Sequence, residues 1–208
     1  GFEVVLDRTA FYPLGGGQAA DTGVLGKTRV LDTREQGKDI IHLCDAPLTP
    51  GTQVEGTIDY QDRFVRMQQH SGEHIVSGII HQRWGYHNTG FHMNLQSVVI
   101  DFDGMIPAEA LPEIEAEANR AVMRNIPVRV FTPGPEELAA LSYRTKRALP
   151  WPVRIVEIPG CDTCACCGTH VAATGEIGLI KLFSAIPFRG GTRMEMACGV
   201  PALALLNR

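Results

Sequence analysis

The sequence contains no run of 18 or more apolar residues of the kind that a membrane-spanning helix needs. It also has no basic start followed by an apolar stretch and a small-residue cleavage site, the pattern of an exported protein. The 208 residues carry 19 Lys and Arg against 23 Asp and Glu, and a net charge of −4 argues against a protein that coats nucleic acid by bulk positive charge. We therefore expect a cytoplasmic protein without membrane contact, in which any contact with nucleic acid is a local patch.

Low-complexity segments are absent too, and a composition of 44% hydrophobic and 20% charged residues is typical of a globular protein. The length suits one large domain or two small ones whose cores need no disulfides. Four of the six cysteines nevertheless fall in one short segment: Cys161, Cys164, Cys166 and Cys167. In a reducing compartment, such clustering indicates metal ligation or redox chemistry before disulfide formation.

The periodicity of the apolar residues predicts an α+β fold in two parts. Short β-like segments fill the first part, residues 1–60, and their length and spacing favour a small barrel or sandwich. Near Asp59 the period changes to that of a helix, which we expect over Gln61–Trp84 at the start of the second part, residues 61–208. The expected strands of the first part are Phe2–Asp7, Gly23–Asp32, Asp39–Cys44 and Thr52–Tyr60. The expected later elements are strands within His87–Phe102, a helix over Pro107–Asn125, a strand Val128–Phe131, a short helix Glu136–Tyr143, strands Val153–Ile158, Leu179–Ile186 and Thr192–Cys198, and a helical segment from Pro201.

A glycine-rich segment lies between the first two expected strands and reads Phe11-Tyr-Pro-Leu-Gly-Gly-Gly-Gln18. Its glycines allow positive φ and the close approach of a ligand or another backbone, but a plain hairpin connection would use them equally well. No Gly-Lys-Ser/Thr follows, so the segment is not a Walker phosphate loop.

Two pairs of residues have the spacing of metal ligands. His70 and His74 are four apart on the expected long helix, so both imidazoles project from one face and can bind one ion. Cys166 and His170 show the same separation far downstream. One thiolate and three imidazoles form a tetrahedral donor set that suits Zn²⁺, so the two pairs together predict a zinc site.

Two other interpretations use the same residues. The four clustered cysteines could bind a structural zinc by themselves, although so short a segment makes tetrahedral geometry awkward. Alternatively, His70-Ser-Gly-Glu73-His74 matches the inverted zincin signature, in which Glu73 is the general base of a protease. The protease would need a carboxylate as third ligand, which one of three glutamates downstream could provide: Glu113, Glu115 or Glu117.

Four motifs occur in a fixed order along nearly the whole chain. They are the glycine-rich segment Thr9–Gly23, His70-x-x-x-His74, Cys166-x-Gly-Thr-His170-Val and Thr174-Gly-Glu-Ile-Gly178. In this combination the sequence resembles the editing domain of alanyl-tRNA synthetase and its free-standing AlaX relatives, in the medium form that carries a glycine-rich motif. Two departures are Cys167, where the family usually has glycine, and Glu73, where it often has a small or apolar residue.

The resemblance implies a β-barrel-like module followed by a zinc-dependent editing domain. It implies that Zn²⁺ is bound by His70, His74, Cys166 and His170, and that the substrate is mischarged tRNA(Ala), most of all Ser-tRNA(Ala), whose aminoacyl ester is hydrolysed. A second, hydrolytic site is needed because a pocket for alanine rejects serine and glycine only weakly. The resemblance points to substrate-binding positions at Thr9, Gly16, Gly17, Gln18, Asp21 and Thr169.

Basic side chains that could contact tRNA phosphates are Arg144, Lys146, Arg147 and Arg193. Such a run can also be a merely solvated face. An RNA-binding module whose zinc is only structural is a further alternative.

Overall fold

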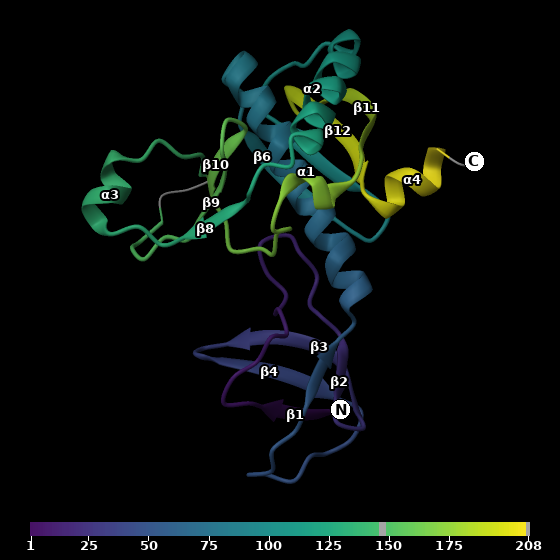
Figure 1. Cartoon of the computed structure of the whole chain (residues 1–208), viewed down its shortest axis with the longest axis vertical. Helices are drawn as coiled ribbons and strands as arrows, with labels where there is room; N and C mark the ends of the chain where they lie inside the picture. The colour runs from purple at the N-terminus through teal and green to yellow at the C-terminus, as the bar shows by residue number, and fades with distance from the viewer. Residues whose placement is uncertain (146–148, 207–208) are drawn as a thin grey trace. The chain divides into compact units, whose positions relative to one another are not determined.

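The computed structural model describes residues 1–145 and 149–206 of the chain and consists of two compact units (Figure 1). The first unit comprises Gly1–Phe64 and the second Val65–Arg208, so the division falls within the first helix, α1 (Tyr60–Trp84). Helices and antiparallel sheets are mixed along the chain, which confirms the expected α+β class.

The N-terminal unit is built on a five-stranded antiparallel sheet with the order β1-β4-β3-β2-β5. Within the described residues, β1 and β5 are the two edges and are not paired with each other. The sheet is therefore open, and the expectation of a barrel-like module is wrong. The strands are β1 (Phe2–Val5), β2 (Gly23–Leu25), β3 (Thr28–Gln36), β4 (Asp39–Cys44) and β5 (Gly56–Ile58).

The second expected strand, Gly23–Asp32, is a hairpin in the structure. Gly26 has φ +60°, a conformation that glycine adopts without steric cost, and this reverses the chain between β2 and β3. The sequence pattern did not reveal this turn, because only Gly26 and Lys27 interrupt an otherwise β-like run. The core of this unit consists of Phe11, Leu25, Val30 and Cys44, with apolar neighbours packed around them.

The C-terminal unit contains two further antiparallel sheets, with the orders β11-β12-β7-β6 and β10-β9-β8 (Figure 1). Its strands are β6 (Asn88–Met93), β7 (Val98–Phe102), β8 (Arg129–Phe131), β9 (Ile155–Ile158), β10 (Asp162–Ala165), β11 (Ile180–Phe188) and β12 (Gly191–Cys198). Its helices after α1 are α2 (Leu111–Met123), α3 (Pro135–Ala140) and α4 (Val200–Leu206), with 3-10 turns at Ala108–Ala110 and Thr174–Ile177. The sequence predicted most of these elements, but it gave no indication of β10 in the cysteine-rich segment.

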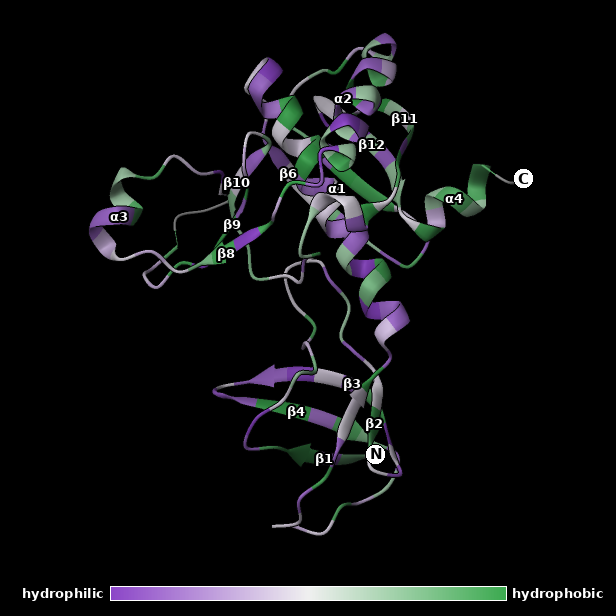
Figure 2. Ribbon diagram, viewed as in Figure 1, coloured by the Kyte–Doolittle hydropathy of each residue, from purple (hydrophilic) through white to green (hydrophobic). Residues whose placement is uncertain are grey.

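Helix α1 is the centre of this unit, since every residue from Gln68 to Ile80 is buried. Figure 2 shows hydrophilic and hydrophobic colours alternating along it. Gln69 accepts a hydrogen bond of 2.8 Å from the backbone N–H of Cys198 in β12. A Cβ at Gly72 would lie 2.2 Å from the sulfur of Cys198, so a side chain at this position would force Cys198 to move. Buried polar side chains are usually hydrogen-bonded, and the partners of His70, Ser71 and His74 belong to the site described next.

In the described part of the chain, no helix is both long and apolar enough to cross a membrane.

Candidate metal centre

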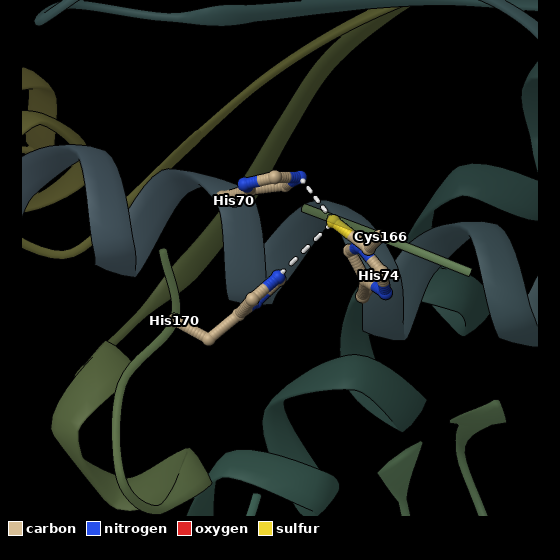
Figure 3. A group of neighbouring side chains, drawn as sticks. All are labelled: His70, His74, Cys166 and His170. Atoms are coloured by element: carbon tan, nitrogen blue, oxygen red, sulfur yellow. Dashed lines mark hydrogen bonds between the residues drawn. The ribbon is translucent and has the colours of Figure 1, made fainter. Parts of the chain in front are cut away.

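The four predicted ligands lie together in the C-terminal unit (Figure 3). Helix α1 provides His70 and His74, and the loop after β10 provides Cys166 and His170. Their ligand atoms all lie within 4.8 Å of one another. The Sγ atom of Cys166 is 3.5 Å from Nε2 of His70 and 3.4 Å from Nε2 of His170. The structure thus brings two segments almost a hundred residues apart in sequence to one point.

These donors fit a zinc ion in chemistry and in spacing. Tetrahedral Zn²⁺ with its usual bond lengths places a sulfur and a nitrogen ligand about 3.6 Å apart. The two sulfur–nitrogen separations of 3.5 and 3.4 Å are close to that value. One soft thiolate with imidazoles is also a set that selects zinc over Mg²⁺ or Ca²⁺, which prefer oxygen.

The protonation states of Cys166 and His170 favour a bound cation, whereas Asp162 and Cys166 outweigh burial and raise the pKa of His74 well above its usual range, so a metal would displace a proton there. Burial alone would keep Cys166 a neutral thiol, but His70 and hydrogen bonds with His170 outweigh it and hold the pKa of that thiol far below its usual range. Burial and the nearby charge of His70 lower the pKa of His170 to about 3, which leaves its imidazole neutral. A thiolate and a neutral imidazole are the protonation states that a metal ligand requires.

Two of the imidazoles are held by hydrogen bonds at Nδ1, the ring nitrogen that would not bind the metal. Nδ1 of His74 lies 2.9 Å from a carboxylate oxygen of Asp162, and Nδ1 of His170 lies 3.1 Å from the hydroxyl of Ser71. Ser71 also accepts a hydrogen bond from the backbone N–H of Val171. Such partners set the tautomer and orientation of metal-binding histidines. Sequence reasoning missed Ser71 and Asp162, although Ser71 lies inside the His70–His74 motif.

The structure distinguishes the two adjacent sulfurs. Cys166 faces the histidines and accepts a 3.4 Å hydrogen bond from the N–H of Gly168, whereas Cys167 is exposed. Arg154 secures this loop by donating to the carbonyl oxygens of Cys166 and Gly168, at 2.6 and 3.1 Å. Among the described residues, neither group of side chains that could hold a metal ion contains more than one of the four clustered cysteines. The structure therefore gives no support to the four-thiolate interpretation.

Glu73 is buried rather than exposed, and its carboxylate is occupied. Its Oε1 atom accepts hydrogen bonds from the hydroxyl of Ser77 and, at 2.7 Å, from the side-chain amide of Asn88. The glutamates considered as third ligand of a protease make other contacts: Glu113 and Glu117 pair with Arg83, and Glu115 binds Lys181 and the N–H of Leu182. These contacts give no support to the inverted zincin interpretation.

The predicted substrate-binding residues belong to two separate units, with Thr169 in the loop between Cys166 and His170 and the others in the N-terminal unit. Gly16 and Gly17 have φ values of +59° and +82° and form the turn between Gly15 and Gln18, whose backbones are hydrogen-bonded to each other. The side chain of Gln18 is buried.

Thr9 and Asp21 have partners inside the N-terminal unit. The hydroxyl of Thr9 lies 2.8 Å from Nε2 of the buried His42 and accepts a hydrogen bond from Phe11. Asp21 accepts from the N–H of Tyr12 at 2.7 Å and forms a two-point ion pair with Arg63. Asp21 therefore fastens the glycine-rich segment to the first turn of α1.

The basic residues predicted to contact tRNA do not form a single run of free charges. The guanidinium of Arg144 is largely buried and pairs with Asp162, so it lacks the exposure that a phosphate contact requires. Arg193 is partly exposed, pairs with Asp101 and lies over the ring of Phe188 at 3.6 Å from the ring centroid. Lys146 and Arg147 lie outside the described residues.

Comparisons with known proteins match both units. Residues 153–195, which include Cys166 and His170, match the family described as "Threonyl and Alanyl tRNA synthetase second additional domain". Residues 1–62 match "tRNA synthetases class II (A)". The alanyl-tRNA editing protein Aarsd1-B of Xenopus laevis is 38% identical over 189 residues, which cover 88% of this chain and 45% of that protein. Over most of its length, this chain matches the alanyl-tRNA editing family.

Two further relatives are also longer than this chain. Alanyl-tRNA editing protein AlaX-L of Pyrococcus horikoshii is 32% identical over 99% of this chain and 53% of its own length. The alanine–tRNA ligase of Thermofilum pendens is 39% identical over 96% of this chain and 24% of its own length. The chain thus spans about half the length of the editing proteins that it matches.

Proposed function

We propose that this chain hydrolyses the aminoacyl ester of mischarged tRNA(Ala), with the seryl ester as its preferred substrate, in a reaction that depends on Zn²⁺. The observation that carries the proposal is the convergence of His70, His74, Cys166 and His170 in a chain that matches the alanyl-tRNA editing family. An aminoacyl ester is a substrate that such a centre suits, because its hydrolysis develops negative charge on the carbonyl oxygen.

The chain's own residues would prepare this centre before substrate arrives. Bound by these four residues, Zn²⁺ would supply Lewis-acid polarisation of the ester carbonyl. Asp162 and Ser71 keep two of the imidazoles in position. Arg154 fixes the loop that carries Cys166 and Thr169, and the Gly168 N–H stabilises the thiolate charge of Cys166. Gln18, with Thr9 in support, remains our candidate for binding the serine hydroxyl.

A deacylation assay tests the substrate. We expect the purified chain to release serine from Ser-tRNA(Ala) faster than glycine from Gly-tRNA(Ala), and to leave Ala-tRNA(Ala) and an unrelated peptide nearly intact. A chelator should stop the hydrolysis while circular dichroism shows that the fold persists. Binding of tRNA without ester turnover would instead favour an RNA-binding module with structural zinc, and rapid peptide cleavage would favour the protease.

Substitution of Glu73 separates the editing enzyme from the inverted zincin. Glu73→Gln should lower the deacylation rate by no more than roughly tenfold, whereas loss of a general base typically costs roughly 10²–10⁴-fold. The reason is that Glu73 is bonded to Ser77 and Asn88, and a glutamine oxygen can still accept from both. Glu113→Gln, which alters a side chain that is 75% exposed, is the control. Collapse of activity with zinc still bound would identify Glu73 as the base and overturn this mechanism.

A further inference from the structure

The turn between β9 and β10 lies against one face of helix α1. Three helix residues spaced four apart, His74, Gly78 and Gln82, contact this turn in succession. The side chain of Gln82 donates a 2.8 Å hydrogen bond to the carbonyl oxygen of Cys161. Residues four apart share a helix face, so the turn follows the same face that presents His74.

Gly78 sets how closely the turn approaches the helix. A Cβ at this position would lie 2.2 Å from the carbonyl oxygen of Cys161, closer than nonbonded atoms allow. Because Gly78 has no side chain, the β9–β10 turn can pack directly against the helix backbone, one helical turn beyond His74. Asp162, the residue after Cys161, is placed against His74 by this contact.

The carboxylate of Asp162 is enclosed and has two partners. Its side chain is 2% exposed. One oxygen accepts from Nε of Arg144 at 2.6 Å, and the other accepts from the terminal guanidinium nitrogen at 2.8 Å and from Nδ1 of His74 at 2.9 Å. Arg144 is itself fixed beside β10, because its backbone exchanges hydrogen bonds with Thr163 and Ala165.

A second set of potential ligands overlaps the first. His74, Asp162 and Cys164 also have ligand atoms within 4.8 Å of one another. One feature of the site acts against a metal there, because Arg144 engages both oxygens of Asp162.

We propose that Asp162 and Arg144 are positioning residues that decide how His74 presents itself to the metal. Asp162 accepts a hydrogen bond from the Nδ1–H group of His74. The lone pair of that imidazole is then on Nε2, the nitrogen that is directed toward Cys166. Arg144 binds both oxygens of the Asp162 carboxylate. It thereby keeps Asp162 from displacing one of the three histidines or Cys166 as a metal ligand. This inference depends on the proposed zinc function, and it assigns to Arg144 a role in the metal centre instead of a contact with tRNA.

The test measures zinc affinity in Asp162→Asn, a variant that preserves the size of the side chain. The amide has one acceptor oxygen where the carboxylate has two, so either His74 or Arg144 faces an N–H group. Competition with a chromophoric chelator should show a zinc dissociation constant roughly 10–100-fold higher than that of the wild type. Glu157→Gln is the matched control, because it removes a partly exposed carboxylate of the same hairpin, paired with Arg129, and should leave the constant unchanged.

A second variant and a spectroscopic measurement complete the test. In Arg144→Lys the ammonium cannot engage both oxygens, so Asp162 gains access to the metal. We expect a smaller loss of zinc affinity and a changed Co²⁺ absorption spectrum. A merely structural role would lower the melting temperature of the zinc-free protein and leave both metal measurements unaltered.

The outcomes separate this inference from the proposed function. A wild-type chain that binds no zinc would refute the proposed function. If the wild type binds zinc and both variants bind it with unchanged affinity and unchanged cobalt spectrum, only the roles of Asp162 and Arg144 are refuted. Should Asp162→Asn fail to fold, Arg144→Lys decides by the same criteria.

Discussion

Replacing Cys166 by alanine is expected to release the metal and abolish ester hydrolysis, whereas Cys167→Ala should leave both close to wild type. Cys166 is the only sulfur in the four-residue cluster, and its Sγ lies between the Nε2 atoms of His70 and His170. A zinc site with a binding free energy of roughly 10–16 kcal/mol owes roughly 2.5–4 kcal/mol to each of four ligands. Loss of one ligand should therefore raise the zinc dissociation constant roughly 10²–10³-fold.

Elemental analysis of the two purified variants, together with their deacylation rates, measures this difference. Cys167→Ala is a close control because it removes the same atom from the neighbouring residue, which is exposed. Equal zinc content in the two variants would contradict the assignment of Cys166 as the ligand. Loss of zinc only in Cys167→Ala would show that the loop binds the metal through the other sulfur.

The four candidate ligands could be predicted from sequence because their spacing is a local property. His70 and His74 share a helix face wherever the helix packs, and Cys166 and His170 lie in one short loop. Asp162 could not be assigned in this way, since its role depends on where the β9–β10 turn meets α1. A carboxylate in a cysteine-rich segment carries no sequence signal for that contact.

Arg144 illustrates the limit of reading charge from sequence. It begins a run of basic residues. From sequence alone, such a run indicates a solvated face or a face that binds nucleic acid. In the structure its guanidinium is largely buried against Asp162, because the segment before residue 146 lies beside β10. Charge pattern cannot indicate which member of such a run turns inward.

The fold shows the same division between local and long-range information. Helix α1 was expected over Gln61–Trp84 and spans Tyr60–Trp84, because its period is continuous over seven turns. Polar side chains are interleaved with the apolar ones along it. Yet all residues from Gln68 to Ile80 are buried, since β12, the β9–β10 turn and the ligand loop each approach the helix and bind its polar groups.

Replacing Gly78 by alanine should destabilise the protein and weaken its zinc binding, although alanine is the better helix former. The intrinsic preference favours alanine by about 1 kcal/mol in the middle of a helix. Overpacking typically costs roughly 1–3 kcal/mol and more where rigid backbone is displaced. The new Cβ would meet the carbonyl oxygen of Cys161 at 2.2 Å and its carbonyl carbon at 3.0 Å, so the turn must move away from the helix. We expect the clash to dominate.

Thermal unfolding and zinc titration measure the two effects. A net cost of about 2 kcal/mol lowers the melting temperature of a chain of this size by roughly 4–8 °C. Displacement of the turn also draws Asp162 away from His74, so the zinc dissociation constant should rise in parallel. Gly134→Ala is the control, because Gly134 has φ −64° and a Cβ added there would meet no atom of a more distant residue within 4 Å. Gly134 is the N-cap of the short helix α3, where alanine is a poorer residue than glycine, so its melting temperature should fall much less than that of Gly78→Ala. A Gly78→Ala protein that is more stable than wild type would mean that helix propensity prevails and that the turn does not lie against α1 at this position.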